Sequence, residues 1–186
     1  MKIKTILVGS ICLAVLLIPA TAQAKNLALG IEGGYFAPGN NMFTDVYGSG
    51  GFYYGVNGAF YLSDSLAIEA GFTMFHADGT ILGTGDETSL NLNTLRFGLF
   101  YNFGMKKLTP KIGAGAVYAM AKEENTFGHS SDSGVGWFAG AGLDFRLTGV
   151  FLVGVELLYH DVEIEGDFGG ESVGGISALF GFKVEI

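Results

Sequence analysis

The amino-acid sequence predicts an all-β fold, an eight-stranded antiparallel barrel that crosses a membrane with its strands. Three observations predict it: apolar residues alternate with small or polar ones, the alternating runs are long, and the connections are alternately short and long. The clearest example is the stretch 134–165 (GVGWFAGAGLDFRLTGVFLVGVELLYHDVEIE), in which two alternating arms flank Thr148 and Gly149. Two such arms around a glycine-containing turn predict a β-hairpin.

The length of these arms and the placement of their side chains favour a membrane over water. Strands of soluble proteins have about five or six residues, whereas a tilted strand needs roughly nine to eleven residues to cross a bilayer. One face of the hairpin carries large apolar residues such as Trp137, Val155 and Tyr159, and the other carries glycine and charged residues. A lipid-facing exterior around a narrow lumen explains both faces. The rival interpretation is a soluble lipocalin-type barrel, whose apolar residues would point inward.

Residues 1–24 have the order of a secretory signal peptide. Two lysines precede an apolar run from Ile6 to Ile18, and Ala22-Gln23-Ala24 is a small-residue cleavage motif. The apolar run is too short for a transmembrane helix. We expect cleavage after Ala24, which leaves residues 25–186 as one membrane β-barrel domain. Cys12, the only cysteine, lies in the leader, so we expect no disulfide and no cysteine-based metal site in the mature chain.

The same alternation predicts eight arms along the mature chain. Their limits are 27–37, 51–63, 65–77, 88–104, 109–122, 135–148, 150–164 and 172–186. Three connections are short (63–65, 104–108 and 148–149), and four are longer, polar and rich in glycine (38–50, 78–87, 123–134 and 165–171). An even strand number, with short turns at one end and long loops at the other, is typical of a bacterial outer-membrane barrel whose short turns lie in the periplasm.

The parity of each arm assigns its side chains to lipid or to the lumen. None of the residues assigned to lipid carries a formal charge. The lumen receives four bases and four acids, namely Arg96, Lys111, Arg146 and Lys183, and Glu32, Glu69, Asp144 and Glu156. Side chains alone fill an eight-stranded barrel, and isolated charges there are costly unless they are paired. We therefore expect a salt-bridged plug; the alternative is a narrow ion path in which these charges select ions.

The lumen face of the fifth and sixth arms also carries glycines. Gly113, Gly115, Gly140 and Gly142 alternate there with larger residues. Glycine inside a strand often marks a place where another group approaches closely. We expect these four positions to leave room for the long arginine and lysine side chains.

Aromatic residues on the predicted lipid face gather near the two ends of the arms. Those near the long-loop end are Tyr35, Phe52, Tyr54, Trp137 and Tyr159, and those near the short-turn end are Phe60, Tyr101, Phe103, Phe145, Phe151 and Phe182. Transmembrane barrels have aromatic girdles at both membrane interfaces. The core of a soluble sandwich would not require its aromatic residues to gather at strand ends. We therefore predict that these two groups lie at the lipid interfaces.

Two segments, 110–121 (PKIGAGAVYAMA) and 138–160 (FAGAGLDFRLTGVFLVGVELLYH), resemble strands of the eight-stranded outer-membrane β-barrel domain family, which includes the OmpA membrane domain and the OmpX-like small barrels. The resemblance extends over 25–186 and lies in glycine, aromatic and turn positions. It implies an outer-membrane location in a Gram-negative cell. It also implies that the assembly machinery of that membrane reads the last strand, in which Phe180, Phe182 and Val184 alternate and Ile186 replaces the commoner terminal phenylalanine.

The predicted long loops are strongly acidic. Lys122 is their only base, and they hold 11 of the 18 acidic residues: Asp45, Asp78, Asp86, Glu87, Glu123, Glu124, Asp132, Glu163, Glu165, Asp167 and Glu171. An acidic surface repels nucleic acid and the anionic head groups of lipopolysaccharide, unless divalent cations bridge them. The simpler interpretation is a solvated surface that keeps the loops soluble.

No motif in the sequence points to a cofactor, and only a weak one points to a reaction. His129, Ser130 and Ser131 resemble the His-Ser arrangement of lipid A deacylases, in which a base activates a serine, but the surrounding sequence of that family is lacking. We therefore expect a monomeric, non-enzymatic barrel with a structural or surface-interaction role, embedded in outer-membrane lipid and lipopolysaccharide. The alternatives are a small porin-like channel for ions or small solutes and, behind it, a lipid A-modifying enzyme.

Overall fold

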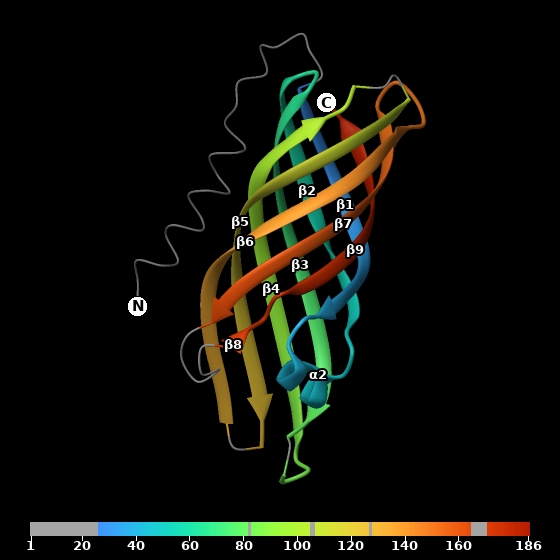
Figure 1. Cartoon of the computed structure of the whole chain (residues 1–186). Coiled ribbons are helices and arrows are strands. Elements are labelled where there is room, and N and C mark those ends of the chain that lie inside the picture. The colour runs from blue at the N-terminus through green and yellow to red at the C-terminus, as the bar shows by residue number, and fades with distance from the viewer. Residues whose placement is uncertain (1–25, 82, 105–106, 127, 165–170) are drawn as a thin grey trace.

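The computed structural model describes residues 26–81, 83–104, 107–126, 128–164 and 171–186 (Figure 1). Within these residues the chain forms nine strands and one short helix. The strands are β1 (Leu27–Pro38), β2 (Gly51–Ser63), β3 (Leu66–Thr80), β4 (Glu87–Asn102), β5 (Leu108–Asn125), β6 (Gly128–Arg146), β7 (Phe151–Ile164), β8 (Glu171–Ser172) and β9 (Gly175–Glu185), and the helix is α2 (Asn41–Tyr47). The signal peptide predicted for 1–24 lies outside the described residues.

Antiparallel pairing closes eight of the strands into a barrel. Each strand from β1 to β7 pairs with the next along the chain, and β9 closes the ring by pairing with both β7 and β1. The two-residue β8 extends the sheet at the end of β7, where Ser172 lies opposite Glu163. The predicted eight-stranded antiparallel barrel is confirmed. The predicted strand limits agree within a few residues except at the start of β6.

Side chains alternate between the lumen and the outer surface with the parity that the sequence predicts. On β1, Ile31 is 65% exposed, whereas its neighbour Glu32 is 6% exposed. On β4, Phe97 and Leu99 point outward and Arg96 is buried. A soluble lipocalin-type barrel would have the opposite arrangement, with its apolar residues inside.

The outward apolar positions form a band of limited height. On β4 and the residue that follows it they run from Leu95 to Phe103. At about 3.4 Å per residue and a tilt of 35–45° this corresponds to roughly 20 Å, near the ~25 Å apolar band of transmembrane barrels. Beyond Leu95 the outward positions become polar, at Asn93 and Asn91. Strands β3 to β6 continue past this boundary as two long hairpins, at the bottom of Figure 1.

These hairpins correct the predicted loop at 123–134. Strand β5 continues to Asn125 and β6 begins at Gly128, so the two strands pair almost to their connection. Similarly, β3 continues to Thr80 and β4 begins at Glu87. Beyond the membrane both faces of a sheet carry polar residues, and the apolar alternation that reveals a strand is therefore lost.

Helix α2 lies within the predicted polar loop at 38–50. Its N-cap is Asn40, whose Oδ1 accepts a hydrogen bond from the Met42 amide at 2.8 Å. The Asn40 Nδ2 atom also donates to the Ser172 carbonyl at 3.2 Å, which ties the start of the helix to the segment that precedes the neighbouring strand β9. Phe43 is the buried residue of the helix. Within the described part of the chain, no helix has the length and apolar character needed to span a membrane.

Candidate functional site: the lumen cluster and the extracellular rim

A cluster of buried polar side chains fills part of the lumen, and each of the eight barrel strands contributes one member. We call it the lumen cluster. Its members, in the order β1 to β7 and then β9, are Glu32, Asn57, Glu69, Arg96, Lys111, Asp144, Glu156 and Lys183. Alternation within the strands turns all eight inward, and closure of the barrel brings them together.

Arg96 holds one side of the lumen cluster. Its Nη1 and Nη2 atoms each donate a hydrogen bond to Glu32, both at 2.7 Å, which is the paired geometry that arginine and carboxylate groups form best. The Asn57 amide donates to the same carboxylate. Glu156 is a more distant partner of Arg96, with 3.7 Å between Nη2 and Oε2.

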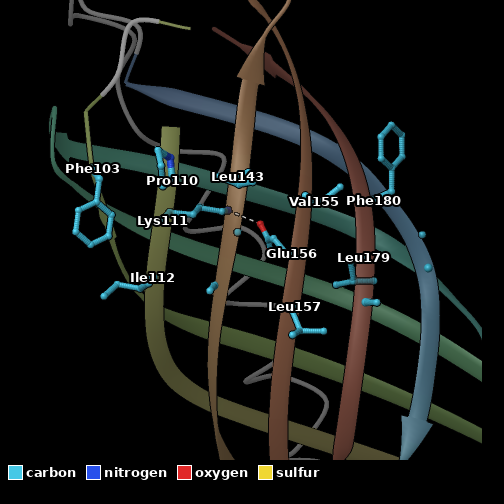
Figure 2. Close-up of a pocket in the computed structure, with 15 residues that line it drawn as sticks. Phe103, Pro110, Lys111, Ile112, Leu143, Val155, Glu156, Leu157, Leu179 and Phe180 are labelled. Atoms are coloured by element: carbon cyan, nitrogen blue, oxygen red, sulfur yellow. Dashed lines mark hydrogen bonds and ion pairs between the residues drawn. The ribbon is translucent and has the colours of Figure 1, made fainter. Parts of the chain in front are cut away.

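Two lysines hold the other side. The Lys111 Nζ atom donates to Glu69 at 2.8 and 2.9 Å and also to Glu156, and Figure 2 shows Lys111 and Glu156 pointing toward each other from β5 and β7. The Lys183 Nζ atom lies 3.2 Å from Asp144 and 3.5 Å from Glu156. Glu156 therefore forms ion pairs with all three bases.

The structure places Arg146 apart from the other seven charged residues that the sequence assigns to the lumen. Its guanidinium group lies at the end of β6 and binds Glu185, at the end of β9, and the Gly149 carbonyl. The position at the strand end explains the difference, because a long side chain there reaches the rim of the barrel instead of its interior. The lumen cluster thus holds four acids against three bases, a formal charge of −1.

Only one of the four predicted glycines makes room for the lumen cluster. A Cβ atom at Gly142 would lie 2.9 Å from Glu156 Cγ and 3.0 Å from Lys111 Cε. Gly113, Gly115 and Gly140 instead leave space for Phe100, Phe138 and Leu158. Gly71, which was not predicted, also makes room, because a Cβ atom there would lie 2.6 Å from Arg96 Cζ. Only the register between β3 and β4, which sets Gly71 opposite Arg96, identifies this position.

Aromatic rings fill the lumen on the extracellular side of the lumen cluster. The Phe36 ring packs edge-on against Phe75, with centroids 5.3 Å apart, and stacks on His160 at 5.2 Å. Phe43 from α2 closes the layer from outside, with its centroid 6.4 Å from that of Phe36. We call Phe36, Phe43, Tyr53, Phe75 and His160 the aromatic layer.

Three hydroxyl groups lie between the aromatic layer and the lumen cluster and bind one another. The Tyr53 hydroxyl lies 2.7 Å from Thr94 Oγ1, which lies 2.6 Å from Thr73 Oγ1. All three side chains are buried. Buried hydroxyl groups need partners, and these three supply partners to one another.

The lumen is open on the periplasmic side. A vestibule of about 880 Å³ enters there, lined by polar residues that include Tyr61, Asn102, Arg146 and Glu185, and it reaches Asp144 of the lumen cluster. A solute from the periplasm would therefore meet charged side chains first and the aromatic layer behind them.

The aromatic residues predicted for the lipid interfaces pack against one another on the outer surface. Toward the extracellular end, Trp137 and Tyr159 have ring centroids 5.4 Å apart, and Phe52 stacks on Tyr54 at 5.8 Å. Toward the periplasmic end, the ring pairs are Tyr101 with Phe103 at 5.0 Å and Phe151 with Phe182 at 5.5 Å. Tyr35 is exposed, as is Phe145, and Phe60 is half-buried. Their contact with lipid stays a prediction.

The extracellular rim carries most of the predicted acidic residues. Asp45, Asp78, Asp86, Glu87, Glu123, Glu124, Asp132 and Glu163 lie within the described residues; Glu165 and Asp167 lie outside them, as does the side chain of Glu171. Lys122 forms an ion pair with Glu124, and the hydrogen bond from Lys122 lowers the pKa of that carboxyl group. In the part of the chain that the structure describes, no group of three or more histidine or acidic side chains is placed to hold a metal ion.

The candidate catalytic residues lie on the extension of β6 beyond the membrane band. His129 and Ser131 are exposed there, and the Ser130 hydroxyl lies 3.4 Å from Asp132 Oδ2. Because residues two apart on a strand share a face, His129 and Ser131 point to one side and Ser130 to the other. His129 and Ser131 thus lie exposed on the outer face of β6, whereas Ser130 is half-buried on its other face.

Comparison with known proteins agrees with this architecture. A family model described as outer membrane protein beta-barrel domain matches residues 10–183. Among solved structures, the chain is similar to Neisserial surface protein A (TM-score 0.66, 12% identity, 86% of this chain and 97% of that one). It is also similar to OprG of Pseudomonas aeruginosa (TM-score 0.61, 17% identity, 87% and 97%). At these identities the likenesses bear on the fold alone. No curated protein matches the chain by sequence.

Proposed function

The chain belongs to the outer membrane protein β-barrel domain family, and within that family we propose that it is a non-conducting barrel whose role is carried at the cell surface. Its location is the outer membrane. The proposal includes a structural or surface-interaction role for the extracellular rim and no catalytic step. It also includes export through a signal peptide cleaved after Ala24, in a Gram-negative cell.

The observation that carries the proposal is the filled lumen. An ion that enters the periplasmic vestibule meets Asp144, which already forms an ion pair with Lys183. Behind it lie the other members of the lumen cluster, which also bind one another. Behind the cluster the rings of Phe36 and Phe75 pack at 5.3 Å, and Phe43 covers them. A hydrated ion would have to break ion pairs and then cross an apolar layer, where charge is strongly disfavoured.

The side chains on the outer surface of the barrel support a proposal about which molecules the protein contacts. The apolar band between the two aromatic groups contacts lipid, and the rim contacts lipopolysaccharide, with divalent cations between the anionic groups. The alternating residues Phe180, Phe182 and Val184 of β9 serve recognition by the outer-membrane assembly machinery. Because the chain closes its own barrel, we propose a monomer, and because the rim is acidic we propose no nucleic-acid partner.

Planar lipid bilayers test the closed lumen. We expect wild-type protein, inserted from detergent, to give no steady current in KCl. The matched control is a channel-forming barrel of known conductance in the same bilayers, which shows that insertion and recording work. Steady wild-type current whose ion selectivity changes in Arg96→Gln would contradict the proposal.

One observation favours the channel as the second candidate. The vestibule of about 880 Å³ already carries solvent to Asp144, so only the lumen cluster and the aromatic layer separate it from the extracellular side. A channel would need these two layers to rearrange together. A voltage-dependent current in wild type that is absent from a variant locked by a disulfide between α2 and the barrel end would favour this candidate.

A further inference from the structure

A pocket of about 320 Å³ lies at the extracellular end, between helix α2 and the barrel rim. It is lined by Asn40, Met42, Phe43, Val46 and Tyr47 from the α2 segment, and by Ile81, Glu123, Asn125, Ser172 and Val173 from the rim. The walls come from four separate parts of the chain, and the hydrogen bond from Asn40 to Ser172 joins two of them. The volume lies at the lower end of the range for small-molecule sites, roughly 300–1,000 Å³.

Most of the pocket wall is apolar. Phe43 and Val173 are buried and form its deep part, while Val46 and Ile81 are half-buried. Met42 is 57% exposed and stands at the entrance. An apolar body placed against this wall would be partly removed from water, which is favourable in proportion to the area buried.

One wall carries a carboxylate. The Glu123 Oε1 atom accepts a hydrogen bond from the Thr88 hydroxyl at 2.8 Å, and the Tyr47 hydroxyl lies 3.5 Å from the same Thr88 oxygen. Among the residues that the structure describes, no lysine or arginine forms an ion pair with Glu123; the nearest base in sequence, Lys122, points to the other face of β5 and pairs with Glu124. No base among the described residues therefore neutralises the negative charge of Glu123 by an ion pair.

Glu123 is the charged residue among those that line the pocket, and Asp45, Asp78 and Glu87 lie elsewhere on the same rim. A carboxylate in a concave site attracts a group of the opposite sign. An amphipathic anion is therefore disfavoured here. A neutral molecule would use the apolar wall alone.

We propose that the pocket between α2 and the rim binds a small organic cation, with its apolar body against Phe43, Val46 and Val173 and its ammonium group at the Glu123 carboxylate. This inference goes beyond the proposed function and does not depend on whether the lumen conducts. It assigns α2 a second role: besides covering the aromatic layer, the helix forms half of a binding site.

The test uses three probes of equal chain length: hexylammonium, hexanol and hexanoate. The protein is placed in nanodiscs of zwitterionic phosphatidylcholine, so that the lipid carries no net charge that would collect the cation. Methionine methyl groups are labelled with ¹³C, and their NMR signals are followed during titration. Met42 reports on the pocket, while Met74, on the outer face of β3, reports on partition into lipid.

We expect hexylammonium to shift the Met42 signal saturably and to bind about tenfold more tightly than hexanol, and we expect no saturable shift with hexanoate. Glu123→Gln should remove the preference for the cation and leave hexanol binding unchanged. The matched control is Asp78→Asn, which removes the same charge from the rim outside the pocket and should retain the preference.

Two further variants test the location. Val46→Trp fills the pocket from α2, and Ile81→Trp fills it from the loop between β3 and β4; each should abolish saturable binding. A migration difference between heated and unheated protein on a gel shows that each variant still forms the barrel. The proposal is overturned if the Met42 shift only follows that of Met74, if hexanol and hexylammonium bind equally, or if hexylammonium binding survives both tryptophan variants.

Discussion

The periplasmic and extracellular halves of the lumen are filled in different ways, although the same strands build both. Strand β1 contributes Glu32 to the lumen cluster and Phe36 to the aromatic layer, four residues further along. Strand β4 likewise contributes Arg96 to one half and Leu92 to the other. Ion pairs require particular partners at particular distances, whereas apolar packing requires mainly volume and shape. The periplasmic half therefore specifies which side chains pair, whereas the extracellular half fills the lumen with apolar side chains.

The difference between the two halves is tested most directly by placing the same new side chain, methionine, in each half. Lys111→Met leaves the Glu69 and Glu156 carboxylates without their main partner, and breaking a buried ion pair from one side lowers stability by about 3 to 5 kcal/mol. Leu92→Met conserves volume in the apolar half and should cost less than about 1.5 kcal/mol. Urea unfolding of the lipid-inserted protein measures both free energies. Equal losses would show that the two halves do not differ in specificity.

The second prediction concerns pairing inside the lumen cluster. Arg96 binds Glu32 through two hydrogen bonds of 2.7 Å but lies 3.7 Å from Glu156. In double-mutant cycles with alanine, we expect a coupling energy of about 1 to 3 kcal/mol for Arg96 with Glu32. The cycle of Arg96 with Glu156 is the matched control and should give a smaller value. A larger coupling in the control cycle would mean that the lumen cluster is paired differently.

The third prediction uses the unequal charge of the lumen cluster. Lys183→Met leaves four acids against two bases and should lower the free energy of unfolding by about 3 kcal/mol. Asp144→Asn leaves three acids against three bases, so we expect a loss of only about 1 kcal/mol, mainly from the weakened bond to Lys183. The same urea titrations provide the measurement. If the loss of the acid is the more costly of the two, the excess negative charge is compensated by some other means.

The smallest expected effect lies at the junction of the two halves. Tyr53→Phe removes one hydroxyl but leaves Thr73 and Thr94 as partners at 2.6 Å. We expect a loss of about 1 kcal/mol, the usual contribution of one hydrogen bond. Thr94→Val, which deprives both Tyr53 and Thr73 of a partner, should cost more, and the reverse order in thermal unfolding would show that the junction contributes nothing through these bonds.

Period-two alternation predicted the fold because lipid and lumen impose opposite demands on successive residues within the membrane. The same reason explains the errors at the extracellular end, where both faces of β5 and β6 meet water and residues 123–134 read as a loop. Helix α2 was missed for another reason. Its seven residues are stabilised by contacts with distant parts of the chain, such as the packing of Phe43 on Phe36, rather than by a helical pattern of their own.

The membership of the lumen cluster was largely predictable, but its pairing was not. Parity shows that Arg96 and Glu32 face inward, yet only the stagger of eight strands decides that they meet across the lumen. Arg146 has the same inward parity, and its position at the end of β6 turns it toward Glu185. Asn57 has the inward parity of β2, but its hydrogen bond to Glu32 was not predicted, because an uncharged amide gives no sign of a charged neighbour.

The contribution of one cluster member by every barrel strand has a consequence for assembly. Glu32 lies on the first strand and Lys183 on the last, and these two strands pair only when the ring closes. An unclosed sheet in the bilayer would therefore expose carboxylates and bases that have no partners, at a cost of several kcal/mol for each unpaired ion. Pairing within the cluster therefore favours complete rings over partly formed ones.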